Sequence, residues 1–276
     1  MDRPDRSRAA RAAAETALAR VVHHYGATPE FVVLGGLVPE LLCRGSNYRH
    51  AGTTDIDVQV NLEIACGATN TERLERALMN AEFRVSQDGV WRWISDDPAH
   101  SKVEVKFELL ADLENRPTGA TFSFDSCKNL GAVNLRGTRF AAEDFTQTKL
   151  RAKIGGTVHE VSVNVTSVAG FLMAKTAAAR ERRKGKDWYD IVFVLRHNDF
   201  GGIEGAANAV LEKFGDRLDV IRSALDDLLA NFEFPHCQGA IAYADQMLED
   251  HPEENRETLL ADAVLSVKSF YKQLFP

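Results

Sequence analysis

Two aspartates, Asp55 and Asp57, lie one residue apart in TTDIDVQV, a stretch that otherwise has the pattern of a buried strand. Side chains two apart on a strand point to the same face, so both carboxylates share one face, and Ile56 and Val58 share the other. Two carboxylates this close repel each other unless a cation lies between them. Divalent cations such as Mg²⁺ prefer carboxylate oxygens and assist phosphoryl transfer. The pair therefore indicates a metal site for phosphate chemistry, although a solvent-facing strand would show the same alternation.

A third carboxylate would complete such a site, and the stretch KVEVKFELL offers two candidates. Glu104 and Glu108 share one face of this predicted strand, with Lys106 between them. We favour Glu108 because it lies nearest the end of the strand, before a loop begins. Glu104 remains an alternative, and an aspartate from a later helix is another.

A glycine pair, Gly35 and Gly36, follows the apolar stretch EFVVL and precedes the predicted helix LVPELLCRG. Backbone N–H groups at the start of a helix bind phosphate, and glycine leaves them accessible. A tight turn between a strand and a helix also selects glycine, so the pair alone is weak evidence. The order of strand, glycine pair, helix, loop and D-x-D places a phosphate cradle and a metal-binding pair at one edge of one sheet.

The hydrophobic pattern divides the chain into a first part of mixed strands and helices and a second part of helices. In the first part it predicts helices at residues 8–25, 37–45 and 69–83, and strands at 30–36, 53–64, 90–95 and 102–112, with turns and short strands over 112–165. In the second part it predicts helices at 167–186, 187–197, 201–215, 216–231 and 253–274. We therefore expect an α+β fold, with a mixed sheet flanked by helices in a domain at residues 1–165 and a helical domain at residues 166–276.

The beginning of the helical part carries another group of charged residues. If the first helix continued through residue 186, Lys175, Arg182 and Lys186 would share one face, which would suit a triphosphate or an RNA backbone. Gly185 argues against such a continuous helix. Asp187 is predicted to cap the next helix, with Asp190 three residues later. A helix cap and an exposed lysine would explain these residues without any chemistry.

Composition excludes several classes of protein. The net charge of −7 is unlike that of a dedicated nucleic-acid-coating protein, although residues 128–153 and 171–197 are locally basic. The four cysteines show no C-x-x-C pair, which argues against a disulfide framework or a structural zinc site. The sequence contains neither a secretory h-region nor an apolar stretch that could span a bilayer. We therefore expect a cytoplasmic protein without a membrane partner.

Three motifs together resemble the DNA polymerase beta-type nucleotidyltransferases, and within them most closely the AbiEii/MenT group of bacterial toxin–antitoxin toxins. The first is the glycine pair followed by T-x-D-[IL]-D at residues 53–57, and the second is the acid before two leucines at residues 107–110. The third is K-x-x-A at residues 175–178 with a basic run and then K/R-D-x-Y-D at residues 186–190. The chain departs from the superfamily in the long gap between Gly36 and Asp55, and in a glutamate where aspartate is usual.

The resemblance implies roles for individual residues. Asp55 and Asp57 would hold magnesium, or manganese in its place. Lys175 would neutralise phosphate charge, and Asp187, in preference to Asp190, would complete the catalytic set. The residues implied in nucleotide binding are Gly35, Gly36, Thr53, Glu108, Lys186 and Asp190.

The expected activity is transfer of a nucleoside monophosphate from a nucleoside triphosphate to an acceptor. The resemblance points to tRNA, at its 3′ end, as the acceptor, to growth arrest as the outcome and to a cognate antitoxin as the protein partner. Two alternatives remain. The acceptor is a small molecule such as an aminoglycoside, or the chain is a nucleotide-binding module that has lost catalysis. The intact D-x-D motif argues against the last of these.

Overall fold

The computed structural model describes residues 7–60, 68–95 and 104–276. The chain groups into two compact units: residues 1–38 with 52–166, and residues 39–51 with 167–276. The second unit thus takes a short segment from the N-terminal half of the chain, which the sequence analysis had included in the first domain.

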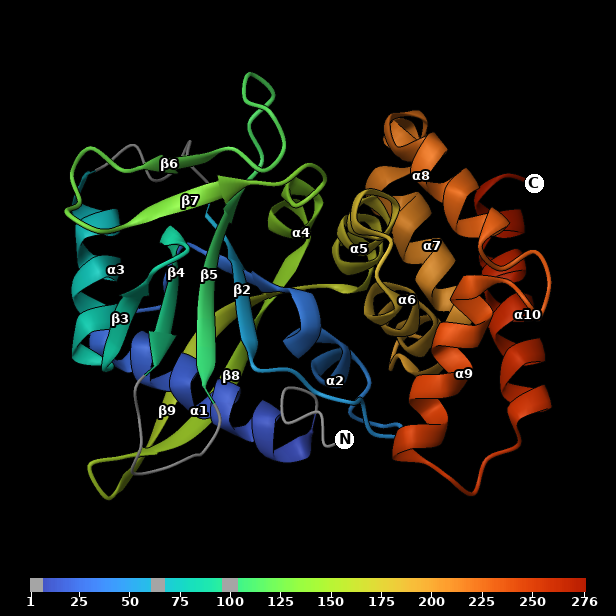
Figure 1. Cartoon of the computed structure of the whole chain (residues 1–276), viewed down its shortest axis with the longest axis horizontal. Helices are drawn as coiled ribbons and strands as arrows, with labels where there is room; N and C mark the ends of the chain where they lie inside the picture. Colours follow the sequence, from blue (N-terminus) through green and yellow to red (C-terminus); the bar gives the residue numbers. More distant parts are fainter. Residues whose placement is uncertain (1–6, 61–67, 96–103) are drawn as a thin grey trace. The chain divides into compact units, whose positions relative to one another are not determined.

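The first unit is built on a mixed sheet, as the sequence predicts (Figure 1). Seven strands follow the order β3-β4-β5-β2-β1-β9-β8, while β7 pairs with both β5 and β6. Strand β2 lies in the middle, antiparallel to β1 and parallel to β5. The strands are β1 (Val32–Leu34), β2 (Asp55–Gln59), β3 (Phe83–Ser86), β4 (Gly89–Ser95), β5 (Val105–Ala111), β6 (Thr121–Ser123), β7 (Gly131–Asn134), β8 (Phe145–Ile154) and β9 (Thr157–Thr166).

The helices of the first unit are α1 (Arg8–Tyr25), α3 (Ala68–Asn80) and α4 (Arg139–Glu143), with a 3₁₀ turn, η1 (Gly35–Leu37), after β1. Helix α1 packs against α3 and runs across β5, β9 and β8 (Figure 1). Its first turn is capped by the Ser7 hydroxyl, which accepts a hydrogen bond from the Ala10 N–H at 3.1 Å. The apolar side chains of the central strands, among them Ile56, Val58 and Phe107, are completely buried. Their burial fixes which face of each strand carries the polar residues.

The second unit is helical, and residues 167–276, all of which are described, contain no strand. Its helices are α2 (Val38–Leu42), which enters the unit at Pro39, α5 (Val168–Arg182), α6 (Gly185–His197), α7 (Gly202–Phe214), α8 (Leu218–Ala230), α9 (Gln238–Asp250) and α10 (Arg256–Leu274), with a 3₁₀ turn, η2 (Gly215–Arg217), before α8. The sequence analysis did not predict α9 as a separate helix. Buried Ala240, Tyr243, Ala244 and Met247 follow helical spacing there, so the signal was present.

The continuous helix through residue 186, against which Gly185 argued, is not present. Helix α5 ends at Arg182, and Arg183 adopts the left-handed conformation, with φ 48°, before α6 begins at Gly185. Lys186 therefore lies on a different helix from Lys175 and Arg182. The predicted cap is also wrong, because Lys184 is the N-cap of α6 and Asp187 lies within its first turn.

Several strand ends differ from the predicted ones. Strand β2 begins only at Asp55, because Thr53 forms a local turn in which its hydroxyl accepts a hydrogen bond from the Asp55 N–H at 3.0 Å. Residues 61–64, the end of the strand predicted at 53–64, lie outside the described residues. Residues 102–103, the start of the strand predicted at 102–112, also lie outside them. The hairpin of β8 and β9 is longer than the short strands expected between residues 112 and 165.

Cys43, Cys127 and Cys237 are free thiols, and Cys66 lies outside the described part of the chain. Within the described residues, no helix combines the length and apolar character needed to cross a bilayer.

Candidate active site

The polar face of the central strands brings acidic and basic side chains into two neighbouring rows. In one row, Arg92 of β4 lies opposite Glu108 of β5, which lies opposite Asp57 of β2. In the next row, Lys106 lies opposite Asp55. Residues directly opposite on neighbouring strands have side chains within contact range. The register therefore gathers three carboxylates and two cations on one face of the sheet.

The register separates the two candidates for the third acid. Glu108 lies beside Asp57, whereas Glu104 is exposed and precedes the first residue of β5. Four residues of extended chain span about 13 Å, so Glu104 belongs to a different level of the sheet. The geometry thus groups Glu108, and not Glu104, with the D-x-D pair.

Negative charge dominates this carboxylate cluster of Asp55, Asp57 and Glu108. Burial raises the pKa of Glu108 to about 7, with the charges of Asp57 and Asp55 adding to the rise and Arg92 opposing it. The Arg92 guanidinium donates from Nε to Glu108 Oε1 at 2.7 Å and also contacts Asp88. Lys106 Nζ lies 3.9 Å from Asp55 Oδ1. Burial is the main cause of the rise in the pKa of Glu108, and the two neighbouring carboxylates add to it.

Both glycines of the predicted cradle lie directly against residues of the D-x-D motif. Gly35 has φ 76°, and a Cβ there would come within 2.0 Å of Asp57 Oδ2. A Cβ on Gly36 would lie 3.0 Å from the Thr53 side chain. Any larger residue at position 35 would therefore displace the Asp57 carboxylate. The helix that follows is not the expected phosphate-binding element, because the glycines start a 3₁₀ turn and α2 has only five residues.

The carboxylate cluster fits a divalent cation that is shared with a substrate. Within residues 7–60, 68–95 and 104–276, no three His, Cys, Asp or Glu side chains are arranged as a complete metal cage. Magnesium rarely uses such a cage and is instead held by one or two carboxylates together with substrate phosphates and water. Asp55 and Asp57 could supply these two carboxylates, and their charges add to the burial that raises the pKa of Glu108.

The second unit contains a buried cluster of opposite charges, the lysine cluster, formed by Lys175, Arg182, Asp187 and Asp190. Lys175 Nζ lies 3.1 Å from Asp187 Oδ1 and 2.8 Å from Asp190 Oδ2. Arg182 Nη2 donates to the same Asp187 oxygen at 2.9 Å. Burial alone would lower the pKa of Lys175, but the charges of Asp190 and Asp187 outweigh it and raise that pKa. Lys175 is therefore a buried cation, and the alternative of an exposed surface lysine is wrong.

The two aspartates of the lysine cluster differ in their remaining contacts. Asp190 uses one oxygen for Lys175 and the other for His50 Nε2, at 2.9 Å. The Oδ2 atom of Asp187 is buried and has no hydrogen-bond partner within the described residues. Buried polar atoms are normally paired, so this oxygen is the one open to a ligand or a water. Lys186 is half-buried on α6.

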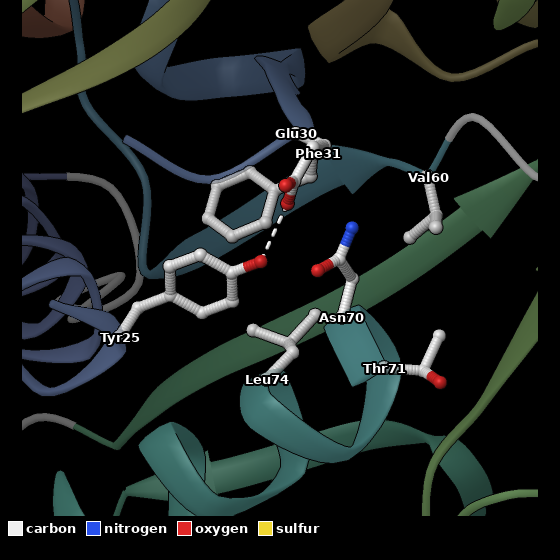
Figure 2. A pocket seen from close by; sticks show the side chains of 7 residues that line it. All are labelled: Tyr25, Glu30, Phe31, Val60, Asn70, Thr71 and Leu74. Carbon is white, nitrogen blue, oxygen red and sulfur yellow. Dashed lines mark hydrogen bonds between the residues drawn. The ribbon is translucent and has the colours of Figure 1, made fainter. Parts of the chain in front are cut away.

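A small cavity in the first unit is too small to hold a substrate (Figure 2). It has a free volume of about 20 Å³, which is room for roughly one water molecule. Its lining comes from α1, α3 and the chain beside β1 and β2: Tyr25, Glu30, Phe31, Val60, Asn70, Thr71 and Leu74. The Tyr25 hydroxyl donates to Glu30 across it at 2.5 Å, and the Asn70 amide points toward this pair. The carboxylate cluster remains the stronger candidate for the site.

Sequence reasoning missed His50 and Arg92 as contact residues. It placed Lys106 and Arg182 on charged faces without identifying Asp55 and Asp187 as their partners. Arg92 alternates with Trp91 and Trp93 in a predicted strand, so its position on the opposite face could have been derived. Its pairing with Glu108 could not, because the order of strands in a sheet is not visible in alternation.

Strand β2 carries D-x-D, the adjacent parallel strand β5 carries Glu108, and Gly35 lies against the Asp57 carboxylate. The family model for the nucleotidyl transferase AbiEii toxin of type IV toxin–antitoxin systems matches residues 16–266. The chain belongs to this family, and it is an enzyme of the nucleotidyltransferase class. The family implies a nucleoside triphosphate substrate and an antitoxin partner. No curated protein matches the chain.

Proposed function

We propose that the protein transfers a nucleoside monophosphate from a nucleoside triphosphate to the 3′ end of a tRNA, in a magnesium-dependent reaction. The register that places Glu108 beside Asp57, with Gly35 packed against the same carboxylate, is the observation that carries the proposal. An acceptor hydroxyl oxygen bonds to the α-phosphorus, the α–β anhydride bond breaks, and pyrophosphate leaves with its electron pair. The hydroxyl proton passes to a carboxylate or to water.

The carboxylate cluster supplies the metal-binding part of this chemistry. Asp55 and Asp57 would hold Mg²⁺, which when bound offsets negative charge on the phosphates and lowers the pKa of the acceptor hydroxyl. Gly35 and Gly36 let the Asp57 and Thr53 side chains lie directly against the backbone, and we propose that these residues line the triphosphate site. Arg92 holds Glu108 in its position in the row. The protein thus contributes positioning and electrostatic stabilisation more than covalent chemistry.

Lys175 and Asp187 are proposed to serve the same reaction. A buried lysine whose pKa is raised remains charged at every physiological pH, which suits it to neutralise phosphate charge. Asp187 is preferred to Asp190 because its Oδ2 is open, whereas both oxygens of Asp190 are engaged. Lys186 and Asp190 are proposed as further nucleotide-binding residues, with Asp190 paired to Lys175.

A tRNA acceptor accords with the basic residues at positions 128–153 and 171–197, in spite of the net charge of −7. A toxin that modifies the 3′ end of tRNA would stop translation, and the antitoxin partner implied by the family would be needed to relieve that arrest. We propose the cytoplasm as its location, because that is where tRNA and nucleoside triphosphates are found.

The proposal is tested by incubating the protein with Mg²⁺, total tRNA and each α-³²P-labelled nucleoside triphosphate in turn. Label should enter tRNA, should be lost when the terminal nucleotide is removed with a 3′ exonuclease, and should be absent in EDTA. An aminoglycoside replaces tRNA in a parallel reaction, analysed by thin-layer chromatography. Label on the aminoglycoside alone, or on no acceptor with any nucleotide, would contradict the proposal.

A further inference from the structure

The long segment between the glycine pair and the D-x-D motif has a structural role that its length alone does not reveal. Residues 39–51 of this segment group with the helical unit, while the chain before Pro39 and after Ala51 belongs to the sheet unit. We name residues 39–51 the excursion. The chain that leads from the glycine pair to the metal-binding strand therefore passes through the other unit.

The excursion is fixed within the helical unit by directional contacts at several points along it. The backbone N–H groups of Arg44 and Gly45 donate to the two carboxylate oxygens of Asp199, at 3.0 and 2.9 Å. The Tyr48 hydroxyl donates to Glu254 Oε1 at 2.6 Å. These anchors hold the middle of the excursion against the residues that follow α6 and those that precede α10.

His50, near the end of the excursion, makes the contact that matters for the lysine cluster. Its side chain is completely buried, and its Nε2–H donates to Asp190 Oδ1 at 2.9 Å. The imidazole stacks on the Tyr189 ring with centroids 5.1 Å apart and meets Phe193 edge-on. The His50 backbone N–H donates to the buried Glu40 carboxylate at 3.0 Å. Both the ring and the backbone of His50 are thus held in one orientation.

Asp190 connects His50 to Lys175, because its second oxygen, Oδ2, lies 2.8 Å from Lys175 Nζ. A carboxylate with a single partner can rotate about its Cβ–Cγ bond, whereas one held at both oxygens by groups on different segments cannot. The His50 hydrogen bond therefore helps to fix the plane of the Asp190 carboxylate and, through it, the position of the lysine ammonium group. Buried networks of this kind transmit position well since every member is surrounded by fixed partners.

We propose that His50 is a positioning residue, which orients Lys175 through Asp190 for the phosphate that Lys175 neutralises. The inference rests on the proposed role of Lys175 in nucleotide transfer. It assigns a function to the long gap between Gly36 and Asp55: the excursion brings to the lysine cluster a histidine that no helix of the unit provides at that point. His50 itself does not touch the reacting atoms.

The test compares His50→Ala, His50→Gln and Tyr48→Phe with the wild-type protein. Glutamine retains an N–H donor near the position of Nε2, so it should rescue the alanine defect. Tyr48→Phe is the matched control, because it removes another anchor of the same excursion that has no contact with Asp190. The first readout is the rate at which Lys175 reacts with acetic anhydride, followed by mass spectrometry of the peptide that contains it.

In His50→Ala, Lys175 should acetylate roughly tenfold faster than in the wild type, since a buried charge loses part of its hydrogen-bond network. His50→Gln and Tyr48→Phe should leave the rate within twofold. The second readout is steady-state kinetics of nucleotide transfer, in which kcat should fall in His50→Ala with the KM for tRNA unchanged. Unchanged acetylation in His50→Ala, or equal effects of His50→Ala and Tyr48→Phe, would overturn the inference. Wild-type protein that transfers no nucleotide would instead refute the proposed function, and the acetylation rates would still decide the role of His50.

Discussion

The carboxylate cluster and the lysine cluster treat charge in opposite ways. In the lysine cluster, two cations face two carboxylates, and Lys175, Asp187 and Asp190 are all buried. In the carboxylate cluster, three acids face two cations, and burial together with the neighbouring acids raises the pKa of Glu108 to about 7. The lysine cluster balances its charges within the fold, apart from the unpaired Oδ2 of Asp187, whereas the carboxylate cluster is proposed to be completed by a cation that the protein does not supply. Stability should depend on the lysine cluster, and metal binding on the carboxylate cluster.

The largest effect is expected from breaking the lysine cluster. Lys175→Met leaves two carboxylates buried without their shared cation, and should lower the free energy of unfolding by about 3–5 kcal/mol. The measurement is urea denaturation followed by circular dichroism. Lys184→Met is the control, because this exposed lysine lies on the turn between α5 and α6 and should change stability by no more than roughly 0.5 kcal/mol. Equal free energies of unfolding for the two variants would mean that the lysine cluster does not stabilise the fold.

Asp57→Asn, in contrast to Lys175→Met, should reduce activity without reducing stability. Nucleotide transfer to tRNA should fall by roughly 10²–10³-fold, since a group that stabilises charge in the transition state is lost. The free energy of unfolding should stay the same or rise, because one of three crowded negative charges is removed. The two quantities are measured on the same preparation by labelled transfer and by urea denaturation. A variant that loses stability and activity together would break the comparison between the clusters.

The carboxylate cluster also predicts how stability depends on pH in the absence of metal. The pKa of Glu108 is raised from 4.5 when exposed to about 7 in the folded chain, so between these values the folded state holds a proton that the unfolded state has released. The free energy of unfolding attributable to Glu108 is therefore highest below pH 4.5, falls as pH rises to about 7 and then levels off. Urea denaturation in EDTA at pH 5.5 and pH 8 measures this fall, and Glu108→Gln should reduce it. Mg²⁺ should stabilise the wild type more at pH 8 than at pH 5.5. If Glu108→Gln leaves the fall in the free energy of unfolding between pH 5.5 and pH 8 unchanged, groups other than Glu108 cause that fall.

Arg92→Gln gives the smallest of these effects and sharpens the comparison further. Removing this cation from beside Glu108 should lower the free energy of unfolding in EDTA by on the order of 1 kcal/mol, because the pair is partly solvent-exposed. Added Mg²⁺ should reduce the loss, since it supplies positive charge to the same carboxylates. Arg151→Gln removes an exposed partner of Glu160 and should show no such recovery. If Mg²⁺ restored the free energy of unfolding in both variants, or in neither, the result would argue against a cation site at the carboxylate cluster.

Sequence patterns predicted those parts of the fold that depend on local chemistry. The alternation in TTDIDVQV placed Ile56 and Val58 in the core, and the hydrophobic pattern predicted helix α1 at residues 8–25, where the structure has it. The end of α5 was missed because Arg183 takes a left-handed conformation that arginine rarely adopts. No residue pattern marks such a position in advance.

The site was predictable only up to the contacts between distant segments. The motif residues Asp55, Asp57 and Lys175 could be named from their types and spacing, and Glu108 could be preferred but not chosen over Glu104. The choice follows from the parallel register of β2 and β5, and the partner of Asp190 follows from the path of residues 39–51. The strand register and the path of this segment are both decided by tertiary packing, which hydrophobic periodicity and secondary-structure propensity do not reveal.

The central claim, that Asp55 and Asp57 form a cation site with Glu108 beside them, is tested most directly by metal binding. Mn²⁺ is titrated into the metal-free protein with a nucleoside triphosphate present, and free Mn²⁺ is measured by electron paramagnetic resonance. We predict that the wild-type protein binds more Mn²⁺ than the nucleotide binds alone, and that Asp57→Asn loses this additional binding. Asp88→Asn should retain it, because Asp88 is a control acid that contacts Arg92 outside the two rows. Binding by Asp57→Asn equal to that of the wild type would contradict the account.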